Sequence, residues 1–222
     1  MNRIAMKGIL MKTIWSGVLA ALLALCGACS DAADGPKVPD SPKTDAADYR
    51  IGDKLAPAVA ARAASAAVAG GYKLTTWEDL TPKDWDPMKD VQALSFRMFG
   101  DGDPRAQAAL DRLKRAWNNA PTNAAMDQQR VRIAGFVVPL EGESDQLREF
   151  LLVPYFGACI HVPPPPANQT IHVKLAKPLA GVRTMDALWV SGTIHAAFSD
   201  TALGTSGYRM EGDVTEAYRR SR

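Results

Sequence analysis

One stretch of this sequence, residues 157–169, gathers a thiol, an imidazole two positions later, four consecutive prolines and two neighbouring amides. It lies between two runs of residues that are typical of β-strands. The residues concerned are Cys159, His161, Pro163, Pro164, Pro165, Pro166, Asn168 and Gln169. Their types predict a place where a soft metal ion or a reactive thiol is held.

A metal site is the first interpretation of Cys159 and His161. If the segment is extended, residues two apart point to the same side, so both side chains can approach one ion while Ile160 packs behind them. Thiolate and imidazole are ligands of zinc and, as the alternative, of copper. Because zinc takes four ligands, the remaining ones must come from His195, from carboxylates, from water or from a partner protein.

Two other interpretations stay open. The motif could be structural, with Cys159 buried, His161 hydrogen-bonded and the prolines shaping a rim. Alternatively, His161 could lower the pKa of Cys159 for nucleophilic attack or redox exchange, although no orienting acid or oxyanion loop is visible beside them. Asn168 and Gln169 could bind a ligand, but amides after a proline run more often cap a turn.

The first 28 residues have the pattern of an export signal, with Arg3, Lys7 and Lys12 ahead of an apolar run that is short for a membrane span. Leu25-Cys26-Gly27-Ala28-Cys29 then resembles a bacterial lipobox, although Cys26 stands where leucine is usual. The resemblance implies that Cys29 carries palmitate or a similar acyl chain as the first mature residue. Ser30, in place of an aspartate, implies anchoring at the periplasmic face of the outer membrane. A plain cleaved signal peptide is the alternative.

Export changes the chemistry of the mature chain. Cys26 would be removed and Cys29 acylated, which leaves Cys159 as a solitary thiol in an oxidising compartment, in need of burial, a metal or a partner. Removal of residues 1–28 also leaves 23 basic residues against 24 acidic ones. This balance gives no electrostatic case for nucleic-acid binding.

The residues after the signal predict a tether and one globular domain. Residues 29–71 are rich in Asp, Pro, Lys and Ala, which indicates a flexible tether with an Ala-rich helix near its end. Residues 72–222 form the domain, with a helical arm over 72–125 and a β-barrel over 126–218. In the arm, Asp103 and Pro104 have the types of an N-cap and a first-turn residue, and apolar residues recur behind them at helical spacing.

Five short strands are predicted, over residues 130–138, 150–153, 170–175, 188–194 and 208–214. The first bends or bulges at Gly135. In the third, Ile171 and Val173 alternate with His172, which is expected to face solvent. A mainly β fold with added helices (α+β) follows, in which a small five-stranded OB-like barrel is preceded by the helical arm.

The sequence resembles the bacterial lipoprotein family catalogued as domain of unknown function 3299. The resemblance spans about Tyr72 to Tyr218. The motifs that carry it are Trp77-Glu78-Asp79-Leu80, Gly135-Phe136-Val137-Val138-Pro139-Leu140, Gly207-Tyr208-Arg209-Met210 and the run from Val153 to Gln169. The family's members are often encoded near transporter permeases and periplasmic proteins of zinc acquisition. The resemblance supports Cys159 and His161 as the functional pair, and gives little support to His172 or His195.

We therefore expect a lipid-anchored periplasmic accessory protein that is not an enzyme. It would bind a divalent metal, with zinc favoured, in metal uptake or homeostasis, together with a transporter or a periplasmic metal-binding protein. A protein-interaction module that docks through the prolines is the first alternative. A thiol redox protein is the second.

Overall fold

The computed structural model describes residues 49–55, 70–86, 103–140, 146–161 and 164–219, which belong to one compact unit, Asp40–Arg222. The predicted signal, most of the tether and its Ala-rich helix lie outside these residues, as do Val162 and Pro163. None of the helices in the described ranges is long and apolar enough to cross a membrane.

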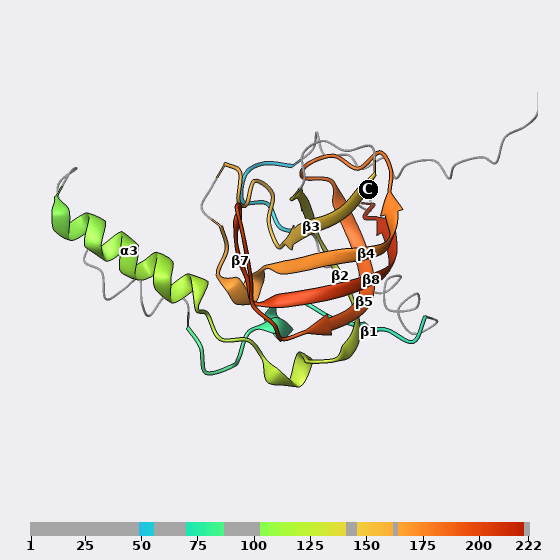
Figure 1. Cartoon of the computed structure of the whole chain (residues 1–222), viewed down its shortest axis with the longest axis horizontal. Coiled ribbons are helices and arrows are strands. Elements are labelled where there is room, and N and C mark those ends of the chain that lie inside the picture. The colour runs from blue at the N-terminus through green and yellow to red at the C-terminus, as the bar shows by residue number, and fades with distance from the viewer. Residues whose placement is uncertain (1–48, 56–69, 87–102, 141–145, 162–163, 220–222) are drawn as a thin grey trace, which may run out of the picture. The chain divides into compact units, whose positions relative to one another are not determined.

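Five strands close into a barrel: β2 (Gln129–Pro139), β3 (Leu147–Val153), β4 (Ile171–Leu179), β5 (Ala187–His195) and β8 (Tyr208–Ala217). Their order is β2-β3-β4-β8-β5, and β5 pairs back to β2 (Figure 1). The β4–β8 pair is parallel, and the other pairs of the barrel are antiparallel. This order is that of the OB-fold, so the predicted small barrel is confirmed.

Strand β2 bends because it is shared between two neighbours. Residues Gln129–Phe136 pair with β5, and residues Phe136–Pro139 pair with β3. A Cβ atom on Gly135 would lie 2.6 Å from Cγ of Leu152, so only glycine lets the two strands approach this closely. The pairing with β5 runs through Gly135 without a register shift, so the alternative of a bulge there is wrong.

Two apolar clusters lie on opposite sides of the barrel wall. Alternate residues of the strands fill the interior, among them Val131, Ile133, Phe150, Leu152, Ile171, Val173, Leu188, Val190 and Ile194. The residues between them form an outer cluster on β2, β3 and β5: Phe136, Val138, Leu151, Val153, Ala187 and Trp189. Tyr49, Leu55, Phe156, Cys159 and Tyr218 pack against this outer cluster. This part of the barrel's outer face is therefore covered by other segments and forms a second hydrophobic core.

The arm before the barrel holds β1 (Lys73–Leu74), η3 (Glu78–Leu80), α3 (Pro104–Asn118) and η5 (Ala124–Met126). The helix predicted after Asp103 is confirmed, and the Asp103 carboxylate accepts a hydrogen bond from the Arg105 backbone N–H. The arm is not purely helical, because β1 pairs in parallel with β2. Inside the barrel the Tyr208 hydroxyl donates to the Leu80 carbonyl at 2.7 Å and joins arm to strand.

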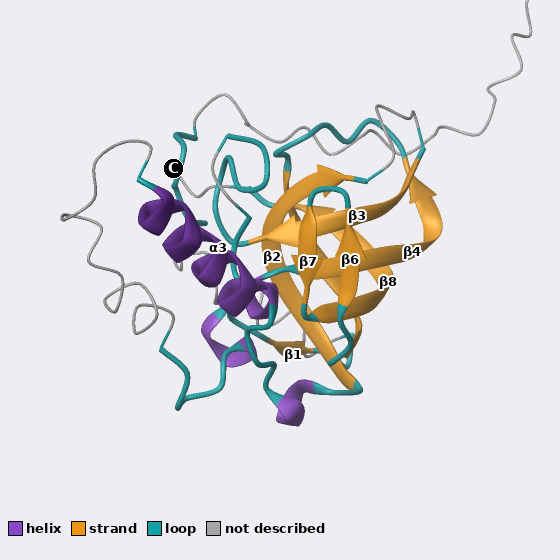
Figure 2. Cartoon of the chain, turned by 60° about the vertical axis from the view of Figure 1, so that its left-hand side comes forward, coloured by secondary structure: helices purple, strands orange, loops and turns teal. Residues whose placement is uncertain are grey.

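A hairpin that the sequence did not predict connects β5 to β8. It consists of β6 (Ser199–Thr201) and β7 (Gly204–Ser206), and lies in front of the barrel strands in Figure 2. The Ser199 hydroxyl lies 2.9 Å from Nδ1 of His172 on β4, so the hairpin contacts the outer face of the barrel.

Candidate functional site

The chain around Cys159 is a tight turn, not an extended segment. Gly157 has φ +86° and Cys159 has φ +64°, and the backbone N–H groups of Ile160 and His161 both donate to the Gly157 carbonyl. The prediction that an extended backbone points the Cys159 and His161 side chains to the same side was therefore wrong. Ile160 was expected to pack behind them, but its side chain is 43% exposed.

Cys159 is a half-buried packing residue of the outer cluster. Its side chain lies against the cluster around Phe136 and Leu151. Burial raises the pKa of the Cys159 thiol to about 11, because the thiolate would lose its hydration there. The turn itself is fixed by the Gly157 N–H, which donates to Sδ of Met185 at 3.0 Å. These surroundings favour the protonated thiol.

The residues after the turn bind parts of the fold to one another. The Asn168 amide donates to the Pro121 carbonyl at 2.9 Å, and the Gln169 amide donates to the Trp77 carbonyl at 2.8 Å. Pro164 packs against the β6–β7 turn, where a Cβ on Gly204 would lie 3.0 Å away. Pro165 is buried and Pro166 half-buried. Asn168 and Gln169 thus connect the start of β4 to the arm rather than to a ligand.

The structure places His195 on a different element from the other two predicted metal ligands, Cys159 and His161. His161 is exposed beside the Cys159 turn, whereas His195 lies at the end of β5, where its Nδ1 is 4.0 Å from Oδ1 of Asp127. Within the described ranges, no group of three or more His, Cys, Asp or Glu side chains is placed to hold a metal ion. Cys159 and His161 could supply two ligands, and a metal would need the others from outside these residues.

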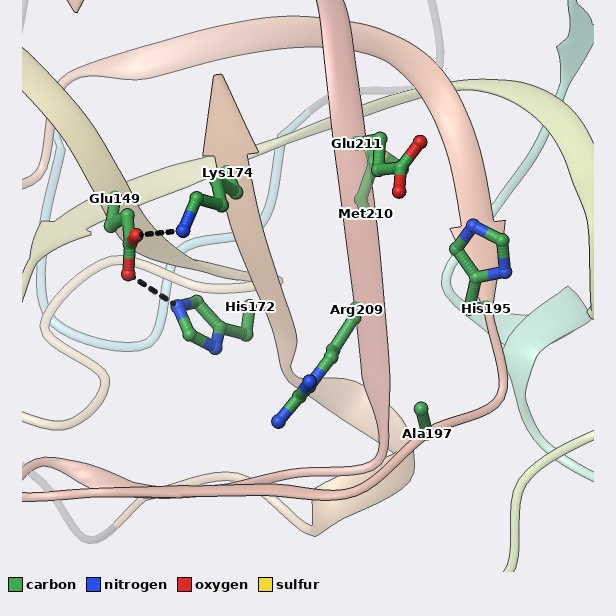
Figure 3. Close-up of a pocket in the computed structure, with 8 residues that line it drawn as sticks. All are labelled: Glu149, His172, Lys174, His195, Ala197, Arg209, Met210 and Glu211. Carbon is green, nitrogen blue, oxygen red and sulfur yellow. Dashed lines mark ion pairs between the residues drawn. The ribbon is translucent and has the colours of Figure 1, made fainter. Parts of the chain in front are cut away.

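A different site lies on the polar half of the barrel's outer face, over β3, β4, β8 and the end of β5. It is a cavity of about 620 Å³ (Figure 3). Its lining consists of Glu149, His172, Lys174, His195, Ala197, Arg209, Met210 and Glu211. We call it the polar pocket. It contains two of the three histidines of the chain.

Strand register explains how these side chains meet. Arg209 on β8 lies between His172 on β4 and His195 on β5, as their direct pairing partner on each side. Glu211, two residues further along β8, pairs with Lys174. Directly paired residues share one face of a sheet, so two rows of polar groups cross the floor of the pocket.

His172 is held between the hairpin and β3. Its Nδ1 lies 2.9 Å from the Ser199 hydroxyl, and its Nε2 lies 3.4 Å from Oε2 of Glu149, close enough for an ion pair when the ring is protonated. Among the described residues Nε2 has no hydrogen-bond partner of good geometry. The side chain is 18% exposed, so the prediction that it faces solvent was wrong. The alternation of β4 was correct, but the hairpin covers that face.

Glu149 is also engaged by Lys174, whose Nζ lies 2.7 Å from Oε1. The hydrogen bond from Lys174 and the nearby His172 hold the pKa of Glu149 below its usual value, against a smaller opposing effect of burial. Arg209 and Glu211, by contrast, are exposed, and their side chains form no hydrogen bond or ion pair with another described residue. Figure 3 shows them diverging from β8, with Arg209 directed toward His172.

Sequence reasoning missed most of this pocket. Glu149 comes from β3, whereas Arg209 and Glu211 come from β8, and their meeting depends on register, which one sequence does not reveal. Ser199 lies in the hairpin that was not predicted. The available signal was the polar face of the third strand, where His172 and Lys174 alternate with buried apolar residues.

Comparisons with known proteins support the resemblance. The model of a family described as "Protein of unknown function (DUF3299)" matches residues 77–217. The crystal structure of a DUF3299 family protein from Pseudomonas aeruginosa PAO1 is 34% identical to this chain, over 68% of this chain and 99% of the other, with a TM-score of 0.53. The search of curated proteins found no match. A family match over more than half of the sequence, with a similar solved fold, places this chain in the DUF3299 family.

Proposed function

We propose that this protein is a non-enzymatic accessory protein of the bacterial cell envelope, anchored by a lipid on Cys29, which binds a ligand in the polar pocket. The observation that carries the proposal is the unpaired state of Arg209 and Glu211 on the floor of a 620 Å³ cavity. Concave sites with a few convergent polar groups are typical of ligand sites, and OB barrels bind ligands on this part of their outer face.

Binding is favoured over turnover, although Ser199, His172 and Glu149 follow the order of a hydrolase triad. Ser199 is only 9% exposed in the hairpin, and it does not line the pocket. The Glu149 carboxylate is shared with Lys174 instead of being reserved for the imidazole. A fluorophosphonate probe should therefore leave Ser199 unlabelled, and labelling that is lost in Ser199→Ala would argue for an enzyme.

Ligand-observed NMR with a small polar fragment set on the purified full chain tests the proposal. Ala197 lines the pocket, so Ala197→Trp should fill it and abolish binding of the fragments that it holds. Ala202→Trp is the matched control, because Ala202 is exposed in the hairpin turn and outside the pocket lining. If no fragment binds, or if every fragment binds both variants equally, the polar pocket is not the ligand site.

A second candidate function is binding of a divalent metal, with zinc favoured, at Cys159 and His161, in metal uptake beside a transporter. It is favoured by the position of both residues in one tight turn. The raised pKa of Cys159 opposes it, because the metal must displace the thiol proton. Zinc titration of the full chain against a Cys159→Ser, His161→Ala double variant tests it, and equal stoichiometry and affinity would remove this site.

A further inference from the structure

We infer that the ligand of the polar pocket is a small zwitterion, with an oxyanion and an ammonium group a few bonds apart. This rests on the proposed function, since it specifies the ligand of that same pocket. The inference follows from which charges in the pocket are already neutralised and which are free.

The charged groups of the pocket fall into two pairs. Glu149 and Lys174 are joined at 2.7 Å, and His172 lies on the other oxygen of Glu149, so this pair has little charge left for a ligand. Arg209 and Glu211 are not joined to each other or to any other described residue. Asp127, outside the lining, faces His195 and accepts the Ala196 N–H. One free cation and one free anion therefore remain on the pocket floor.

The spacing of this free pair fits a ligand between the two groups. Arg209 and Glu211 are two residues apart on β8 and point to the same face, which separates their Cα atoms by roughly 7 Å. Their side chains diverge in Figure 3, instead of closing on each other. A ligand oxyanion can accept two hydrogen bonds from the Arg209 guanidinium, while its ammonium donates to the Glu211 carboxylate.

The balance of charge argues against a ligand with one charge. A simple anion would meet Glu211 within the same cavity, and a simple cation would meet Arg209, so each would leave a repulsive contact. A zwitterion satisfies both groups. The imidazole of His195, which pairs with Arg209 from β5, adds a donor or an acceptor for a carboxylate or a phosphate.

Matched probes separate these ligand classes. L-alanine carries both charges, whereas propionate lacks its ammonium and ethylamine lacks its carboxylate. Phosphoethanolamine tests whether a phosphate, as in a lipid headgroup, replaces the carboxylate. Saturation-transfer NMR on the full chain should show L-alanine or phosphoethanolamine binding at least about tenfold more tightly than the single-charge compounds, since each loses a charge-assisted contact.

Two variants and a control assign the contacts. Arg209→Gln should weaken both the zwitterion and propionate, whereas Glu211→Gln should weaken only the zwitterion, to about the affinity of propionate. Arg183→Gln, at an exposed loop position outside the pocket lining, should change neither. Circular dichroism melts check that all three variants fold.

The results distinguish this inference from the proposed function. If propionate or ethylamine binds as tightly as L-alanine and phosphoethanolamine, or if neither zwitterion binds, the zwitterion inference is wrong. The pocket would still be a ligand site in that case if Ala197→Trp removes other fragments. If no fragment shows binding that Ala197→Trp removes, both the zwitterion inference and the proposed function are wrong.

Discussion

Cys159 is the residue whose role the structure changes most. If the protein is exported, as we propose, a solitary thiol needs protection, and the packing of Cys159 against the outer cluster provides it. The positive φ of Cys159 is uncommon for a residue with a side chain, and it is stabilised by the two N–H donors that converge on the Gly157 carbonyl. The turn directs the thiol inward and leaves His161 outside.

The buried thiol should alkylate slowly. A pKa of about 11 in place of 9.0 lowers the thiolate fraction of Cys159 at neutral pH by about a hundredfold. The higher intrinsic nucleophilicity of that thiolate recovers about tenfold, so iodoacetamide should react about tenfold more slowly than with a free cysteine. The rate should keep rising with pH up to about 11, as deprotonation proceeds.

Reaction in urea provides the control, because the unfolded chain should alkylate at the rate of an ordinary cysteine. A native rate that equals the unfolded rate, or that levels off below pH 9, would contradict this account. Either result would also support the alternative that Cys159 is the reactive thiol of a redox protein.

Among the described residues that form ion pairs, Arg132 has the most buried side chain. Its guanidinium is 5% exposed, donates to both oxygens of Glu216 at 2.9 and 3.0 Å, and lies over the Trp189 ring. Glu216→Gln would leave this cation without its counter-charge, and should lower the free energy of unfolding by about 1–3 kcal/mol. The half-exposed position of Glu216 keeps the loss below that of a fully buried pair.

Urea unfolding of Glu216→Gln measures this effect. Asp213→Asn is the matched control on the same strand, since Asp213 bonds only the exposed Tyr72 hydroxyl and should change stability by less than about 0.5 kcal/mol. If the two variants are equally stable, the Arg132–Glu216 pair contributes nothing measurable.

At the scale of elements, period-two alternation identified residues 130–138, 170–175 and 188–194 as strands, whereas the strand over 150–153 is an apolar run whose two faces are both buried. The same rule failed at Cys159, where the apolar residues continue into a turn and the backbone enters the left-handed region. It also failed to show that His172 is covered. No local pattern reports that a hairpin 27 residues further along the chain folds back over a strand.

Tyr208 is one of the residues that attach the arm to the barrel. Its hydroxyl donates to the Leu80 carbonyl at 2.7 Å and accepts the Asn123 N–H at 2.6 Å, and its pKa is raised to about 12, mainly by burial. Tyr208→Phe removes both bonds and should cost about 1–3 kcal/mol, measured by thermal or urea unfolding. Tyr72→Phe, which loses one exposed hydrogen bond, is the control and should stay near wild type. Equal stability of Tyr208→Phe and Tyr72→Phe would show that the two hydrogen bonds of the Tyr208 hydroxyl contribute nothing measurable.

At the scale of the whole molecule, the count of short strands and the kinked first one were enough to predict an OB-like barrel. The polar pocket could not be predicted in this way. It exists because the closed barrel brings β3, β4, β8 and the end of β5 onto one face, in a register set by tertiary packing. Closure also divides the outer surface, with the outer cluster on one side and the polar pocket on the other.

Anchoring at the membrane is the remaining prediction for the whole chain, and it rests on Cys29, outside the described residues. In cells fed labelled palmitate, Cys29→Ala should abolish incorporation of the label, because this cysteine is the acylation site in our interpretation of the lipobox. Cys26→Ala is the matched control, since Cys26 belongs to the segment that is removed, and it should keep the label and the outer-membrane fractionation. If Cys26→Ala loses the label and Cys29→Ala keeps it, the signal is cleaved before Cys26 and Cys26 is the acylated residue. Absence of label in the wild type would instead indicate a plain cleaved signal and a freely diffusing domain, in which the polar pocket would act away from the membrane.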